Sequence, residues 1–258
     1  MQPLDFLMHI PKTAGISLQG IARRRYPAGA LELVYQEKSV QKGFTDLREL
    51  QLVMGHFPYG YHRFSERPAR YHVFLREPVD QVISHHRYTL DHPEKFPDLK
   101  LPISLRDFAK SNYGHNLQSR FISGLREETD PQILYEKACE NLRNFDTIGL
   151  SESFDESLIM LADALGWKRF YYQAGNAGKA RQRISPPPKD EIDELKTLLQ
   201  ADLKLYALAR KRFELDKANY PALTARTQRF QKANRLFQKV NPFYVRLKKL
   251  AGTATDPH

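Results

Sequence analysis

The chain has 258 residues, 41% apolar and 27% charged, as expected of a globular protein long enough to bury its own core. Its one cysteine, Cys139, excludes an intramolecular disulfide and a cysteine-based zinc cluster. The sequence contains no run of about 18 apolar residues, so we expect no membrane-spanning helix. Residues 1–10 also lack the basic start of a signal peptide, so we expect a cytoplasmic protein.

The net charge of +10 is spread unevenly along the chain. Residues 222–258 hold eight lysines and arginines against one acid, which is seven of the ten net charges. The preceding part is only mildly basic, so we do not expect a nucleic-acid partner. The sequence therefore predicts one domain over residues 1–221 and a basic tail over residues 222–258.

Strand-like and helix-like segments alternate along the chain, which predicts an α/β fold with a largely parallel central sheet. The expected strands are residues 5–10, 51–57, 70–76 and 146–150. The expected helices are residues 17–25, 78–88, 104–112, 131–144, 154–165 and 189–215. Two segments rich in proline, glycine or charge, residues 91–102 and 175–185, are expected to be loops.

The loop after the first strand reads PKTAGIS over residues 11–17. A helix N-terminus at the end of a strand offers free N–H groups and a partial positive charge to an anion. Lys12 adds a mobile charge, Thr13 and Ser17 add hydroxyl donors, and Gly15 would let a ligand approach the backbone. Taken alone, a capped surface turn is the commoner explanation. An NTPase loop is disfavoured, because its lysine follows the glycines and here it precedes the only one.

A second anion site is indicated where the third expected strand ends. Arg76 stands at that end, a Glu-Pro helix start follows, and Ser84 lies eight residues beyond Arg76. A guanidinium presents a fork that fits a phosphate, and a serine two turns into the helix could reach the same group. Two anion sites at strand ends of one sheet suggest a ligand with two separated phosphate-type groups.

The two stretches HIPKTAGISL and FLREPVDQVISHHRY resemble the paired cofactor-binding motifs of sulfotransferases that use 3′-phosphoadenosine 5′-phosphosulfate. The pattern is most similar to the branch of heparan sulfate 2-O-sulfotransferases and many bacterial relatives. The resemblance covers residues 4–90, extends loosely to GHNLQSRFISG at 114–124, and is thin beyond residue 150. It implies that residues 1–221 form the sulfotransferase domain, a P-loop NTPase-like three-layer sandwich with a central parallel sheet.

The resemblance also implies which residues bind the donor and its product, adenosine 3′,5′-bisphosphate. The 5′-phosphosulfate site would consist of Lys12, Thr13, Ala14, Gly15, Ile16 and Ser17. Arg76 and Ser84 would grip the 3′-phosphate. The late basic loop offers Lys179, Arg181 and Arg183, and we expect Arg183 to reach that phosphate, although a solvated loop explains these charges equally well.

Sulfuryl transfer needs charge stabilisation on the leaving oxygen and a base for the acceptor proton. Lys12 is placed for the first task, so no metal is required. His56 in VMGHFPYG is the candidate base, because imidazole titrates near neutral pH and the related enzymes carry a catalytic Gly-His element there. Their second histidine, two residues earlier, corresponds to Met54 here.

Four other side chains could act as the base: His9, His85, His86 and Glu77. His85 and His86 are adjacent on a helix and point about 100° apart, so at most one faces a cleft. His9 could line the pocket or be a buried strand-end residue. Glu77 is better explained as a helix-start acid favoured by the helix dipole.

The basic tail has apolar residues at three- and four-residue steps with cations between them, which predicts an amphipathic helix interrupted at Pro242. Three roles stay open for it: packing on the domain, steering an acidic substrate, or peripheral contact with an anionic membrane through residues 226–249. The last would place the protein at the inner membrane surface.

The sequence thus favours sulfuryl transfer from 3′-phosphoadenosine 5′-phosphosulfate to a hydroxyl acceptor, by resemblance a carbohydrate or glycolipid. Two alternatives remain. A nucleotide-dependent kinase shares the fold and would depend on magnesium. A non-catalytic nucleotide- or glycan-binding protein would bind the cofactor without transferring anything.

Overall fold

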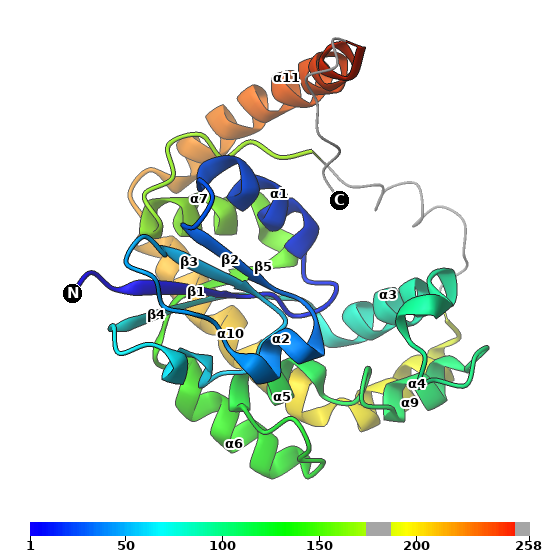
Figure 1. The fold of residues 1–258 in the computed structure, drawn as a ribbon. Coiled ribbons are helices and arrows are strands. Elements are labelled where there is room, and N and C mark those ends of the chain that lie inside the picture. The colour runs from blue at the N-terminus through cyan, green and yellow to red at the C-terminus, as the bar shows by residue number, and fades with distance from the viewer. Residues whose placement is uncertain (174–186, 251–258) are drawn as a thin grey trace.

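The computed structural model describes residues 1–173 and 187–250, arranged as a central sheet covered by helices (Figure 1). The sheet has five strands, all parallel, in the order β2-β3-β1-β4-β5. They are β1 (Leu4–Met8), β2 (Leu31–Val34), β3 (Leu52–Gly55), β4 (Ala69–Leu75) and β5 (Phe145–Leu150). Parallel strands covered on both faces are apolar along their length, and every residue of β1 and of β3 is buried.

Helices cover both faces of the sheet and form the outer layers (Figure 1). Helices α1 (Gly15–Arg25) and α7 (Phe154–Ala164) lie on one face, and α5 (Leu117–Ser123), α6 (Pro131–Leu142) and α10 (Gln200–Ala218) lie on the other. The predicted α/β fold, a P-loop-like three-layer sandwich with a parallel central sheet, is therefore confirmed.

A second, smaller apolar cluster lies beside the main core and joins three further helices. These are α3 (Pro78–Asp91), α4 (Leu105–Lys110) and α9 (Lys189–Leu198). The buried residues Val82, Phe108 and Leu199 belong to this cluster. It anchors α3, the helix that follows Arg76.

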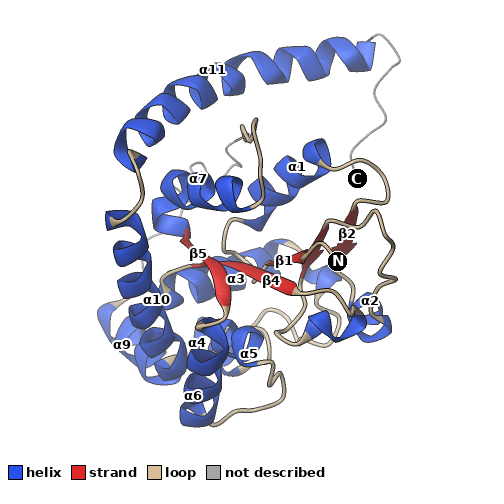
Figure 2. Cartoon of the chain, turned by 90° about the vertical axis from the view of Figure 1, so that its left-hand side faces the viewer, coloured by secondary structure: helices blue, strands red, loops and turns tan. Residues whose placement is uncertain are grey.

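The remaining elements are short, apart from the last helix. They comprise α2 (Glu37–Lys42) and three 3₁₀ turns at Tyr61–Phe64, Pro93–Lys95 and Ser151–Ser153. The last helix, α11 (Leu223–Leu250), crosses the outside of α7 and continues past it (Figure 2). No helix in the described part of the chain is both long and apolar enough to cross a membrane.

Three local predictions are wrong. The sequence missed β2, a four-residue edge strand in which only Val34 is buried, so residues 52–55 form the third strand and not the second. The helix expected over 189–215 is two helices separated at the buried Leu199. Helix α11 is continuous through position 242, without the expected interruption.

Candidate functional site

The residue that follows each strand lies on one edge of the sheet, because all strands are parallel. In sheet order these residues are Tyr35, His56, His9, Arg76 and Ser151. This carboxyl edge is where open α/β sheets bind ligands. It brings the predicted base His56 and the predicted phosphate ligand Arg76 to the same edge as the loop that carries Lys12.

The loop between β1 and α1 has an unusual backbone. Lys12 has φ 68° and Ala14 has φ 73°, both in the left-handed region although neither is glycine. Such conformations cost roughly 1–3 kcal/mol each and persist only where surrounding contacts hold them. The Thr13 hydroxyl donates to the Ile10 carbonyl at 2.8 Å, which closes the loop on itself. Thr13 is also buried, and its hydroxyl proton is already used in this bond.

Two side chains, one directly after β4 and one on α3, hold this loop from outside. Arg76 donates from Nη1 to the Lys12 carbonyl at 3.2 Å, and Gln81 donates from Nε2 to the Pro11 carbonyl at 2.9 Å. Gln81 is fully buried, and its Oε1 has no hydrogen-bond partner in the described structure. The two predicted anion sites are therefore in direct contact, and the sequence analysis missed Gln81 as their link.

The left-handed turn at Ala14 leaves backbone N–H groups at the start of α1 without an acceptor in the described residues. Ala14 occupies the N-cap position without a side-chain cap, and the first turn contains no acid. Ser17 and Leu18 donate their N–H groups to the Ala14 carbonyl, whereas those of Gly15 and Ile16 find no acceptor in the described residues. Free N–H groups at the positive end of a helix are the donors that a phosphate-type anion requires.

Lys12 lies close to other cations and has no ion pair with a carboxylate in the described part of the chain. Its ammonium sits over the Tyr88 ring, 4.4 Å from the centroid. Burial lowers the pKa of Lys12, the neighbouring charge of Arg76 lowers it further, and Asp91 opposes the shift. Two cations held beside a free helix N-terminus repel each other, and an anion bound among them would relieve that repulsion.

Arg76 is positioned through its backbone by α5. Gln118 accepts from the Arg76 N–H at 3.0 Å and donates to the Arg76 carbonyl at 2.9 Å. The buried carboxylate of Asp202 in turn accepts from the N–H groups of Gln118 at 3.1 Å and Ser119 at 2.6 Å. Burial raises the pKa of Asp202 to about 6 despite these bonds. The segment 114–124 thus positions Arg76, the residue predicted to bind the second anion.

Ser84 lies on α3 and is half-buried, but it makes no hydrogen bond to Arg76 in the described structure. Ile16 is 74% exposed at the start of α1, and Ser17 is half-buried beside it. Arg183, expected to reach the same phosphate as Arg76, lies outside the described residues, as do Lys179 and Arg181.

The candidate base His56 has a defined tautomer. Its Nδ1 lies 2.5 Å from the His9 carbonyl, which can only accept, so Nδ1 carries the proton and Nε2 carries the free lone pair. Burial lowers the pKa of His56 to about 4, partly opposed by this bond to the carbonyl. At neutral pH the ring is therefore uncharged and has one nitrogen free to accept a proton.

Tyr35 completes an aromatic cluster with the two histidines, and the sequence analysis missed it. Its ring packs edge-on against His56 at 4.8 Å, and its hydroxyl lies 3.2 Å from His9 Nδ1. Burial raises the pKa of Tyr35, so the hydroxyl keeps its proton. Tyr35 was missed because β2 was missed. Had the pattern LELVY been recognised as a strand, Tyr35 would have been expected at the carboxyl edge of the sheet.

Gly15 makes room for the His9 ring. A Cβ at Gly15 would lie 1.7 Å from His9 Nε2, far inside van der Waals contact. The expected reason for a glycine here was close approach of a ligand, but a protein side chain already requires it. The same imidazole contacts the start of α1 and, at a ring distance of 4.5 Å, the candidate base His56.

The other candidate bases have structural partners. His85 is buried with Nδ1 3.0 Å from the Tyr113 carbonyl, and His86 has Nε2 2.8 Å from the Ile103 carbonyl. Glu77 caps α3 by accepting from the Asp80 N–H at 2.7 Å, the helix-start role expected of it. His85 and His86 lie on α3 and Glu77 at its start, so of the candidate bases only His9 and His56 directly follow a strand at the carboxyl edge.

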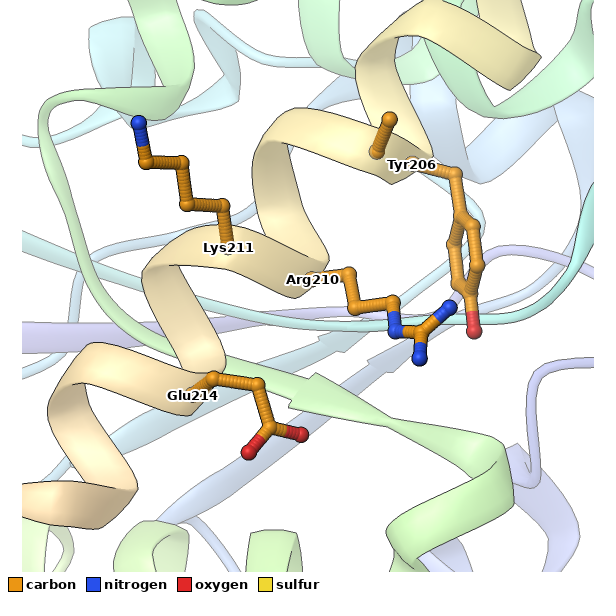
Figure 3. Close-up of a pocket in the computed structure, with 5 residues that line it drawn as sticks. Tyr206, Arg210, Lys211 and Glu214 are labelled. Carbon is orange, nitrogen blue, oxygen red and sulfur yellow. The ribbon is translucent and has the colours of Figure 1, made fainter.

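A shallow hollow on the outer surface of α10 lies apart from this edge. It is lined by Tyr206, Ala207, Arg210, Lys211 and Glu214. Figure 3 shows Tyr206 and Arg210 on one side of the helix and Lys211 turned away from them. One helix supplies the whole lining, and none of the strand-end residues takes part, so the hollow is not the candidate site.

No protein-family model and no curated protein matches the chain. Among solved structures it is similar to a sulfotransferase from Alicyclobacillus acidocaldarius, at 14% identity and a TM-score of 0.45, over 81% of this chain and 96% of that one. It is also similar to the mouse sulfotransferase SULT7A1 complexed with PAP, at 16% identity and a TM-score of 0.38, over 69% of this chain and 62% of that one. At such low scores, what the chain does has to be inferred from its own residues.

Replacing Gly15 by alanine tests the contact with His9. We expect Gly15→Ala to destabilise the fold by about 1–3 kcal/mol, because the added methyl group overlaps the buried ring. In a His9→Ala background the same change should cost much less. Gly20→Ala is the matched control in α1, since a Cβ there meets only Arg24 Nη1 at 3.6 Å. Urea denaturation measures all four variants, and an equal cost of Gly15→Ala in both backgrounds would contradict the assignment.

The low pKa of His56 predicts a neutral ring in mildly acidic solution. NMR of ring-labelled histidine should show the His56 signals unchanged from neutral pH down to about pH 5, where a histidine of ordinary pKa is mostly charged. His56→Asn assigns the signals. Because the folded pKa lies below 6.5, this residue also lowers folding stability as pH falls from 6.5 towards 4. Titration of the assigned signals near pH 6.5 would refute the buried environment.

Proposed function

We propose that this protein is a sulfotransferase that moves a sulfuryl group from 3′-phosphoadenosine 5′-phosphosulfate to a hydroxyl acceptor. The observation that carries the proposal is the meeting of Lys12 and Arg76 at the open N-terminus of α1. A neutral histidine, His56, stands on the same sheet edge. The motifs around Lys12 and Arg76 resemble the paired donor-binding motifs of this enzyme class.

The residues present suit the two anionic groups of the donor. The N–H groups of Gly15 and Ile16, with the ammonium of Lys12, would hold the 5′-phosphosulfate. The guanidinium of Arg76, with Ser84 and Arg183, would hold the 3′-phosphate. The contact between Arg76 and the Lys12 carbonyl supports the view that both groups belong to one ligand.

The proposed step breaks the bond between sulfur and the bridging oxygen and forms a bond between sulfur and the acceptor oxygen. The acceptor proton passes to Nε2 of His56, the nitrogen with the free lone pair. Lys12 neutralises the charge that develops on the leaving phosphate oxygen. A bound anion nearby also favours the charged form of His56, so the base becomes stronger once the donor has bound.

The acceptor class is proposed on the resemblance to the heparan sulfate branch, which favours a hydroxyl of a carbohydrate or glycolipid. A kinase of the same fold is the principal alternative. The order of residues in the loop argues against it, because Lys12 precedes the only glycine. A protein that binds the nucleotide without transferring a group is the other alternative, and it shares every binding expectation with the enzyme.

The second phosphate site is tested by calorimetry with adenosine 3′,5′-bisphosphate. Arg76→Ala should weaken binding by about tenfold or more, since it removes a charge-assisted contact. Binding of adenosine 5′-monophosphate, which lacks the 3′-phosphate, should change less. Arg87→Ala, on α3 and outside the proposed site, is the control. Unchanged affinity of Arg76→Ala for the bisphosphate, or a wild-type preference for ATP with magnesium, would overturn the proposal.

Transfer itself is tested by measuring how much labelled sulfuryl group passes from the donor to each of a panel of glycan and glycolipid acceptors. Lys12→Ala should abolish turnover and also weaken donor binding. His56→Ala should lower turnover by about 10²–10⁴-fold, the usual contribution of a general base, while leaving bisphosphate affinity near that of the wild type. Equal turnover of His56→Ala and the wild type would exclude His56 as the base.

A further inference from the structure

The inner face of helix α11 packs against the domain. The Phe230 ring is buried and stacks on Phe170 at 5.0 Å, and Asn234 accepts from the Tyr172 N–H at 2.8 Å. Arg226 forms a two-bonded ion pair with Asp163, each bond 2.7 Å long. Of the roles left open for the tail, packing on the domain therefore accounts for this face.

The outer face of α11 carries cations that the domain does not neutralise. Arg229, Lys232, Arg235 and Lys239 are exposed, and none has an ion pair within the described residues. At 100° per residue these four positions fall within an arc of about 120°, centred opposite Phe230 and Asn234. Between Leu223 and Leu250 the sequence contains no aspartate or glutamate.

Two large aliphatic side chains stand beside these cations. Leu236 is 64% exposed and Val240 is 55% exposed; at 100° per residue Leu236 falls within the basic arc and Val240 about 20° beyond its edge. Single exposed aliphatic residues are common on protein surfaces, but these two stand among four cations that have no ion pair within the described residues. Their presence among cations is typical of helices that lie in the surface of a bilayer, where cations meet lipid phosphates and aliphatic groups enter the acyl boundary.

We propose that the outer face of α11, defined by Arg229, Lys232, Arg235, Leu236, Lys239 and Val240, docks on an anionic lipid surface. The proposal is independent of sulfuryl transfer, because none of these residues belongs to the strand-end site. Figure 2 supports the geometry: α11 lies on the outside of the molecule, across α7, with nothing described beyond it. A nucleic acid would satisfy the cations but not the two aliphatic groups, so a bilayer is the better match.

Flotation of the full chain with vesicles tests the proposal. The protein should float with phosphatidylcholine vesicles that contain phosphatidylserine, remain in solution with phosphatidylcholine alone, and be released by high salt. Changing Arg229, Lys232, Arg235 and Lys239 to glutamate should lower the partition coefficient at least about tenfold, since each cation near the surface adds to binding. The control reverses four exposed lysines elsewhere, Lys38, Lys42, Lys100 and Lys110.

The aliphatic part is tested by Leu236→Ser with Val240→Ser, which should weaken flotation several-fold and leave its salt dependence unchanged. Leu208→Ser with Leu215→Ser, at exposed positions of α10, is the matched control and should have no effect. Circular dichroism and bisphosphate binding verify that each variant is folded.

Three results would overturn the proposal: no flotation of the wild type, equal loss in the two charge-reversal variants, or binding to duplex DNA without flotation. Failure of the membrane proposal would leave donor binding intact. Failure of the proposed function would leave flotation intact.

Discussion

The bonds from Arg76 and Gln81 to the carbonyls of Lys12 and Pro11 are the constraint on which the site depends. They hold a loop whose backbone is left-handed at two non-glycine residues, a conformation that would otherwise relax. The same turn ends the loop at Ala14 and leaves the first N–H groups of α1 free. The strain in the loop and the open helix end are therefore two results of one arrangement.

This arrangement also places like charges together. The charge of Arg76 adds to burial in lowering the pKa of Lys12. On the neighbouring strands, burial keeps His9 and His56 uncharged and lowers the pKa of both rings. A polyanionic ligand reverses each of these effects, because it stabilises every nearby cation. The electrostatics of the edge thus suit an anionic substrate and a base that strengthens when that substrate binds.

The two faces of helix α11 differ in their contacts. Its inner aromatic residues stack on residues 170–172, so the start of the tail belongs structurally to the layer that covers α7. The outer cations have no such partner within the described residues. In the sequence Arg226, which pairs with Asp163, cannot be told from the outer cations by charge alone. Burial in the folded chain separates the face that packs on the domain from the face that is exposed to solvent.

The sequence by itself determined the α/β class, the loop before α1, the strand end at Arg76 and the cap at Glu77. These features are local, since strand and helix periodicity and capping depend on residues a few positions apart. Only the tertiary structure decided that Tyr35 neighbours His56, that Gly15 accommodates His9, and that Gln81 and Gln118 bond to the backbone of the two proposed anion sites. Each of these contacts joins segments far apart in the chain, and the strand order that brings them together is set by packing of the whole sheet, which no local pattern encodes.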